Sequence, residues 1–216
     1  MIEIKNVTLG YVKGKPLYNN LNLDIECGKI TAIIAPFGSG KTTLLNALIG
    51  TMPTTSGHIK IGGDDTKSNK HLDKIAVMYQ NYHFYNDISA KANAIFFALV
   101  EGVDVDNDKL ELLFKEYELA DYIDDKVGTF NHEMKRKLAL LITALNDSPY
   151  ILLDEPTTGI SIEGKHKLWK KLRKLANEGK TIIVTASELH EVIDCDYVAQ
   201  IKDGNLNSHT KFSNIS

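Results

Sequence analysis

The sequence predicts an α/β fold with a mainly parallel central sheet. Three short apolar runs, at residues 29–34, 150–153 and 181–185, have the length and continuity of strands that are buried on both faces of such a sheet. Helical patterns follow two of these runs, at residues 43–49 and 164–177. Strands that alternate with helices in this way are the units from which parallel sheets are built.

A glycine-rich loop joins the first run to its helix, and it predicts a phosphate-binding site rather than a plain Gly/Ser turn. Glycines let backbone N–H groups converge on one concavity, and the helix that follows directs its positive end to the same point. We expect Lys41 to reach the β- and γ-phosphates of ATP and Thr42 to bind Mg²⁺. Ala35 replaces the usual first glycine. The residues predicted to hold the nucleotide here are Ala35, Pro36, Phe37, Gly38, Ser39, Gly40, Lys41, Thr42 and Thr43.

A pair of carboxylates follows the second apolar run and predicts the catalytic side of the same site. Asp154 and Glu155 come directly after the strand at residues 150–153, so they lie at the edge of the sheet where ligands bind. We expect Asp154 to hold Mg²⁺, usually through water, together with Thr42. Glu155 would polarise the attacking water, and a positioned general base typically supplies about 10²–10⁴-fold in rate. The catalytic candidates are therefore Glu155 and Lys41.

The remaining elements are shorter or less regular. Residues 1–9 and 17–25 alternate in part between apolar and polar side chains, which predicts two strands. We further predict strands at 58–61 and 75–79, helices over 89–118 with a polar break at 104–108 and over 138–145, and an edge hairpin at 197–205.

The composition predicts a soluble intracellular chain with one core. The 216 residues are 43% hydrophobic, and the net charge of −3 gives no sign of a nucleic-acid partner. Cys27 and Cys195 lack metal-site spacing, so we expect reduced thiols in or near the core. The longest apolar stretch, at 92–100, is far too short to span a membrane, and no signal-peptide pattern begins the chain. Any role at a membrane is therefore expected to be peripheral.

Together these motifs resemble the ATP-binding cassette ATPases that drive membrane transporters, and the resemblance covers essentially the whole chain. Residues 154–159 are similar to the family's Walker B motif and the loop after it. Gln80, in Tyr-Gln-Asn, stands where the family's Q-loop senses Mg²⁺ and meets the transmembrane partner. Tyr11 stands where the family stacks an aromatic ring on adenine, although local packing is an alternative. Residues 134–138 resemble the helix start after the signature motif of exporter-type cassettes.

The resemblance implies a P-loop NTPase fold, with an N-terminal antiparallel β region and a helical insert at about 82–145 inside a single domain of residues 1–216. It implies ATP and Mg²⁺ as ligands. The implied partners are a transmembrane permease subunit and a second cassette, in a homodimer or a heterodimer, because hydrolysis in the family requires two cassettes head to tail. The implied location is cytoplasmic, on the inner face of the cell membrane.

The signature motif departs from the family pattern. Where the family has Leu-Ser-Gly-Gly-Gln, this chain has Phe130, Asn131, His132, Glu133 and Met134. Asn131 can cap a helix and Glu133 then falls in its first turn. A carboxylate about 4 Å from a phosphate charge costs about 1 kcal/mol in water and about 4 kcal/mol at an effective dielectric constant of 20. Donation from His132 to phosphate would offset part of this cost; otherwise the motif has lost its role across the dimer.

Two further positions differ from the family. Ser161 replaces the usual Asp that bonds across the dimer, and Ser187 replaces the switch histidine. Loss of one preorganised donor commonly costs on the order of 10²–10³ in rate. His190 lies one helical turn later, and two interpretations remain for it: a substitute for the switch histidine or, more simply, a solvent-exposed histidine. We therefore expect ATP binding with slow or partner-dependent hydrolysis.

Three functions remain open from the sequence. The first is the ATPase subunit of a membrane exporter, and the second is an impaired nucleotide-binding regulatory subunit of such a complex. The third is a soluble cassette outside transport. The basic amphipathic pattern at 165–174 fits a core-packed helix with a solvated lysine face, or a helix that touches anionic lipid.

Overall fold

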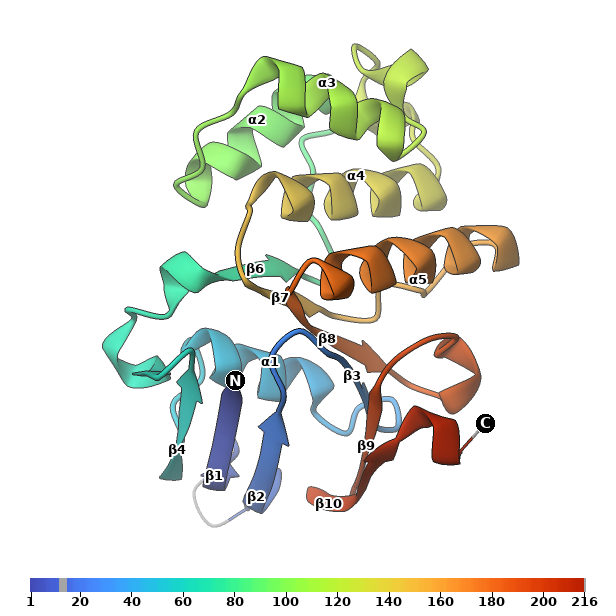
Figure 1. Cartoon of the computed structure of the whole chain (residues 1–216). Helices are drawn as coiled ribbons and strands as arrows, with labels where there is room; N and C mark the ends of the chain where they lie inside the picture. The colour runs from blue at the N-terminus through green and yellow to red at the C-terminus, as the bar shows by residue number, and fades with distance from the viewer. Residues whose placement is uncertain (12–14, 216) are drawn as a thin grey trace.

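A six-stranded sheet forms the centre of the protein, in the order β10-β9-β3-β8-β7-β6 (Figure 1). The computed structural model describes residues 1–11 and 15–215. Within them, the pairs among β6, β7, β8, β3 and β9 are parallel, and β10 runs antiparallel to β9. The mainly parallel sheet expected from the apolar runs is therefore confirmed. Its strands are β3 (Ile30–Ile34), β6 (Ile75–Met78), β7 (Tyr150–Leu153), β8 (Thr181–Ala186), β9 (Tyr197–Lys202) and β10 (Asn205–Lys211).

The central strands are apolar throughout because both faces of the sheet are covered. In β7, Ile151 and Leu153 pack with the helices on one face, whereas Tyr150 and Leu152 pack on the opposite face with the N-terminal strands and the first helix. Such two-sided burial removes the alternation that marks a strand with one wet face.

A smaller antiparallel sheet, in the order β2-β1-β4-β5, lies on the side of the first helix. β1 pairs antiparallel with both β2 and β4, which confirms the expected N-terminal antiparallel region. β4 begins two residues before the predicted strand. The strands are β1 (Ile2–Leu9), β2 (Tyr18–Ile25), β4 (Ser56–Ile61) and β5 (Asp64–Asp65).

The helices form two groups around the central sheet (Figure 1). α1 (Lys41–Ile49) packs between the two sheets, and α5 (Ile162–Asn177) covers the opposite face. α2 (Ala90–Val100), α3 (Asn107–Glu116) and α4 (His132–Leu145) gather beyond α5 at one end of the molecule. Short 3-10 turns lie at Thr66–Ser68, Leu72–Lys74, Ala120–Tyr122, Val127–Thr129, Leu189–Glu191 and Phe212–Asn214. In the described part of the chain, no helix combines the length and apolarity needed to cross a membrane.

Helix boundaries and one cysteine differ from the sequence prediction. α4 begins at His132 rather than at residue 138, because Asn131 Oδ1 accepts a hydrogen bond from the Met134 N–H at 2.9 Å and caps the helix. The first turns of α4 are polar, so the apolar period becomes visible only later. Cys195 is buried as expected, whereas Cys27 is exposed and the expectation of a near-core thiol was wrong there.

α5 is amphipathic in the way that the sequence indicated. Leu168, Trp169, Leu172 and Ala176 are buried in the main core. Its lysines lie outside this stripe, and several pair with glutamates. The helix is thus held by its apolar face.

Candidate functional site

The glycine-rich loop leaves β3 and closes tightly before α1. Gly38 and Gly40 have φ values of 75° and 98°, which are accessible to glycine without strain. A β-carbon on Gly40 would lie 2.2 Å from Leu17 Cδ2, so a larger residue would also collide. The Ala35 N–H donates to the Ala186 carbonyl at 3.2 Å, which anchors the loop to β8. Phe37, in contrast, is 87% exposed.

Lys41 is buried and folds back over this loop. Its Nζ donates to the carbonyls of Ala35 at 2.8 Å and Pro36 at 3.2 Å. It also lies 3.0 Å from Ser187 Oγ and 3.1 Å from Glu155 Oε1. The ammonium group therefore occupies the concavity of the loop, where the positive end of α1 adds to its charge. An anion that enters the loop meets both.

Asp154 and Thr42 form a pair of oxygen donors suited to a hard cation. Thr42 Oγ1 donates to Asp154 Oδ2 at 2.7 Å, and Thr185 Oγ1 donates to Asp154 Oδ1 at 2.6 Å. Asp154 is almost fully buried. Mg²⁺ prefers one or two carboxylate or hydroxyl oxygens and completes its shell with water and phosphate. These residues fit that cation, and the described residues hold no cluster of three or more His, Cys, Asp and Glu that would suit a different metal.

Glu155 is held from both sides of its carboxylate. Oε1 lies next to Lys41 and Ser187 Oγ, the latter at 2.9 Å, and Oε2 accepts from Gln80 Nε2 at 2.8 Å. Burial would raise the pKa of Glu155, but the hydrogen bonds of Lys41 and Ser187 and the charge of Lys41 outweigh it and hold the pKa below its ordinary value. The carboxylate is therefore ionised at neutral pH. Its backbone has a φ of 47°, a left-handed conformation that is rare outside glycine.

Gln80 connects this carboxylate to α4. It follows β6, and its backbone carbonyl accepts a hydrogen bond from Arg136 Nη1 at 3.0 Å. Arg136 is 6% exposed; burial lowers its pKa, although the charges of Glu155 and Asp154 act in the opposite direction. The described contacts of the Gln80 side chain are with Glu155 and not with Thr42. Arg136 could not be singled out from the sequence, because its position between two lysines in the first polar turns of α4 carries too weak a signal.

Tyr11 lies at the start of α1, beside the loop. Its hydroxyl is 2.9 Å from Thr43 Oγ1, and its side chain is 72% exposed. Thr43 itself is buried, so its part at the site is to anchor Tyr11. The exposed ring leaves an aromatic face free for a base to stack on.

The residues at the signature position contact the start of α5. Glu133 Oε2 lies 3.4 Å from the Ser161 N–H, and Glu133 Oε1 lies 3.6 Å from Lys137 Nζ. The His132 ring lies over Gly159, where an added β-carbon would approach it to 2.6 Å. Ser161 caps α5 by accepting from the Gly164 N–H at 3.2 Å. The negative charge of Glu133 is thus partly offset by contacts within its own chain.

His190 does not reach the site. Its Nδ1 is 3.0 Å from Glu188 Oε2, and its side chain is 70% exposed. Ser187, by contrast, contacts both Lys41 and Glu155. From the sequence, Ser187 was expected to be a loss of function, and these contacts with distant residues leave no signal in the sequence.

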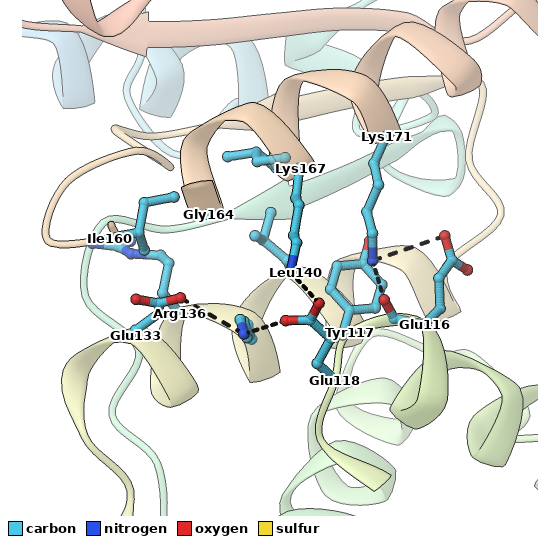
Figure 2. Close-up of a pocket in the computed structure, with 12 residues that line it drawn as sticks. Glu116, Tyr117, Glu118, Glu133, Arg136, Leu140, Ile160, Gly164, Lys167 and Lys171 are labelled. Carbon is cyan, nitrogen blue, oxygen red and sulfur yellow. Dashed lines mark hydrogen bonds and ion pairs between the residues drawn. The ribbon is translucent and has the colours of Figure 1, made fainter. Parts of the chain in front are cut away.

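A separate pocket lies between α4 and α5, with about 540 Å³ of empty volume (Figure 2). Its walls are apolar at Leu140 and Leu168, and its rim is charged. Glu118 accepts hydrogen bonds from Lys137 at 2.7 Å and from Lys167 at 2.6 Å, which lowers its pKa to about 2. None of the loop residues or the paired carboxylates lines this pocket. It is a junction between α5 and the helices beyond it rather than the site of chemistry.

Known proteins share this arrangement. Residues 18–158 match the model of the family described as ABC transporter. The chain is 31% identical over 211 residues to the uncharacterized ABC transporter ATP-binding protein YhcH of Bacillus subtilis. This alignment covers 95% of this chain and 68% of that protein. It is 31% identical to the lantibiotic transport ATP-binding protein SrtF of Streptococcus pyogenes, over 95% of this chain and 89% of that one. The chain is also 31% identical to the ABC transporter G family member 20 of Dictyostelium discoideum, but it spans only 28% of the length of that protein.

Solved structures agree with the sequence comparison. The dimeric bacterial ABC transporter cassette MJ0796 superposes with a TM-score of 0.87 at 25% identity, and 98% of each chain is covered. The same cassette bound to ADP and Pi gives a TM-score of 0.85 at 26% identity, again over 98% of each chain. With its family match, its relatives and its fold in agreement, this chain belongs to the ABC transporter family, as one of its ATP-binding cassettes.

Proposed function

We propose that this chain is the ATP-binding subunit of a membrane exporter, and that it binds ATP with Mg²⁺ at residues 35–43. The observation that carries the proposal is the convergence of four side chains from separate elements. Thr42 and Asp154 are 2.7 Å apart, and Lys41 and Glu155 are 3.1 Å apart. One ammonium group, one hydroxyl and two carboxylates next to one glycine-rich loop fit a magnesium-chelated triphosphate.

Each side chain has a distinct part in the proposed reaction. Lys41 exchanges the loop carbonyls and Glu155 for phosphate oxygens. Thr42 and Asp154 would hold Mg²⁺. Gln80 would respond to the cation through its hydrogen bond to Glu155. The cation would neutralise charge on the phosphates. Glu155, already ionised, then accepts a proton from the attacking water, and Gln80 keeps its second oxygen oriented. Tyr11 offers its exposed ring to the adenine base.

Hydrolysis by this site is proposed to be slow or dependent on a partner. Glu133 stands at the signature position, where its carboxylate would repel an incoming phosphate, and its contacts with Lys137 and Ser161 of the same chain offset that charge only in part. Ser187 and Ser161 lack the reach and charge of the residues that the family has there. The same observations favour a second candidate, a regulatory subunit in which ATP only controls assembly.

The proposed partners are a second cassette and a transmembrane permease subunit, with the chain held at the cytoplasmic face of the membrane. Support for a docking surface comes from aromatic side chains that run from the Gln80 loop to α2. Tyr79, Tyr85, Phe96 and Leu99 are each at least 40% exposed, and the rings of Tyr85 and Phe96 are 5.0 Å apart. Exposed apolar groups of this kind are typical of interfaces. Export as the direction rests on relatives named for lantibiotic transport and Nod factor export.

We further propose that residues 1–216 form one cassette domain, with residues 82–145 as its helical insert. The insert as drawn includes α2, α3 and α4, which gather at one end of the molecule (Figure 1). Its return to the central sheet is through the loop between α4 and β7.

Substitution of Glu155 by Gln tests the proposed function. The change keeps size and hydrogen bonding but removes the base, so we expect turnover to fall by about 10²-fold or more while ATP still binds. Steady-state hydrolysis and calorimetry measure the two effects, with Glu163→Gln on the exposed start of α5 as the matched control. Transport that is unchanged by Glu155→Gln would support the regulatory subunit instead. Failure of the native chain to co-purify with an integral membrane protein would support a cassette outside transport.

A further inference from the structure

Ser187 lies between the two catalytic candidates. Its Oγ is 3.0 Å from Lys41 Nζ and 2.9 Å from Glu155 Oε1, and those two atoms are 3.1 Å apart, so the three side chains form a closed triangle. The position of Ser187 is set by its backbone, because its N–H donates to Glu191 Oε2 at 2.9 Å. Glu191 belongs to the short turn at Leu189–Glu191 that follows β8. The hydroxyl is therefore held in place through the turn that follows β8.

The direction of each hydrogen bond in the triangle follows from the chemistry of its members. A lysine ammonium only donates and an ionised carboxylate only accepts. The Ser187 oxygen must therefore accept from Lys41, and its single hydrogen must go to Glu155. Lys41 has three hydrogens for four nearby oxygens, at Ala35, Pro36, Ser187 and Glu155. Lys41 is therefore the member of the triangle that phosphate oxygens can draw away.

We propose that Ser187 is a positioning residue that keeps the Glu155 carboxylate oriented after ATP has drawn Lys41 away. This inference rests on the proposed hydrolysis of ATP. When phosphate oxygens take Lys41, Glu155 loses its cation, and Oε1 retains the Ser187 hydroxyl while Oε2 retains the Gln80 amide. Two fixed donors then set the plane of the carboxylate and leave lone pairs free for the attacking water.

The use of a hydroxyl has a consequence for pH dependence. A histidine has an ordinary pKa of about 6.5, so an imidazole at this position would change charge between about pH 5 and 8. A serine hydroxyl does not titrate in that range. Turnover by this chain is thus expected to lack an ionisation step from residue 187, and Ser187→His is expected to introduce one.

The test compares Ser187→Ala with Ser187→Thr in the full chain. Loss of a hydrogen bond to a charged group reduces kcat for Mg-ATP by about 10- to 100-fold, whereas KM stays within about twofold because the phosphate ligands are intact. Ser187→Thr keeps the hydroxyl and restores most of kcat. Ser213→Ala, an exposed serine outside the site, is the matched control and leaves both constants unchanged. Thermal unfolding of each variant shows whether the fold is retained.

A second measurement does not depend on turnover. With the β,γ-imido analogue of ATP bound, carbon-detected NMR is expected to show a displaced and broadened Glu155 carboxyl resonance in Ser187→Ala, because a donor that fixes the carboxylate in wild type has been removed. Equal carboxyl resonances together with an unchanged kcat would overturn the inference, as would a fall in kcat that Ser187→Thr does not restore. Failure of the proposed function is distinguishable, because wild type would then show no heat on titration with ATP.

Discussion

At the scale of single residues, the site depends on buried charges that neutralise each other. Lys41 and Glu155 are both at most 6% exposed, and their ion pair is bridged by Ser187. Removal of one member of such a pair leaves the other charge buried without compensation. ATP binding therefore exchanges one set of neutralising contacts for another and does not create a charge.

Lys41→Ala is expected to weaken ATP binding by about 30-fold or more. The reason is that loss of one partner of a buried, hydrogen-bonded charge pair costs about 2–5 kcal/mol. Calorimetric titration with Mg-ATP measures the effect. Lys202→Ala, which removes an exposed lysine at the end of β9, is the control and should bind as wild type does. Equal affinities in the two variants would contradict the assignment of the loop.

At the scale of elements, the site is assembled where parallel strands end. β3 leads to Lys41, β6 to Gln80, β7 to Asp154 and Glu155, and β8 to Ser187. In register, Ile34 lies opposite Ala186 and Leu153 opposite Val184, so the ends of these strands meet at one edge. Parallel sheets place their ligand sites at this carboxyl edge. Residues more than 100 positions apart in the chain thus reach hydrogen-bond distance.

Two elements of the helical region are also joined by an ion-pair network, at the junction between α5 and the helices beyond it. Glu118, in a left-handed conformation with a φ of 59°, joins Lys137 of α4 to Lys167 of α5. Its folded pKa of about 2 is below the ordinary value of 4.5, so it stabilises the fold above pH 4.5 and this contribution is lost as the pH falls toward 2. Since the pair is about half exposed, salt screens it.

Glu118→Gln is therefore expected to flatten the fall in melting temperature on acidification below pH 4.5. Thermal unfolding between pH 3 and 6 measures the slope of melting temperature against pH. The series is run at low salt and at about 0.5 M NaCl, because salt screens the pair. Glu178→Gln, at the far end of α5, is the control, because its contact with Lys174 is 3.9 Å long and exposed. An identical pH slope in wild type and Glu118→Gln would show that the junction contributes nothing to stability.

At the scale of the whole molecule, the signature position lies on the helical end and the phosphate loop on the central sheet. Proposed head-to-tail assembly of two cassettes would bring Glu133 of one copy toward the triphosphate of the other. The carboxylate would oppose that approach by about 1 kcal/mol or more. Its contacts with Lys137 and Ser161 are long, at 3.4–3.6 Å, and compensate the charge weakly.

In a Glu155→Gln background, Glu133→Gln is expected to strengthen ATP-dependent self-association by about fivefold or more. Sedimentation velocity with and without Mg-ATP measures the dimer. The control is Glu178→Gln, which removes an equal charge elsewhere. Equal dimerisation in the two variants would contradict a repulsive role for Glu133, and no self-association in either would exclude a homodimer.

Local sequence was sufficient for those parts of the protein whose cause is local. Uninterrupted apolar runs at residues 150–153 and 181–185 follow from burial on both sheet faces, so the strands and their parallel pairing were predictable. The glycine-rich loop with Lys41 and Thr42 was also predictable, because a phosphate-binding backbone requires glycine at fixed spacing. Asp154 and Glu155 followed from their place at a strand end.

Tertiary structure alone decided the partners of these residues. Ser187 lies 146 residues from Lys41 and 32 from Glu155 in sequence, and Arg136 lies 56 from Gln80; no periodicity or motif links them. Their contacts arise only when four strand ends and α4 converge on one edge of the sheet. A side chain reports its own chemistry in the sequence, whereas its hydrogen-bond partner depends on how distant elements pack. Hence the loop and its carboxylates could be identified from the chain, and the serine that joins them required the fold.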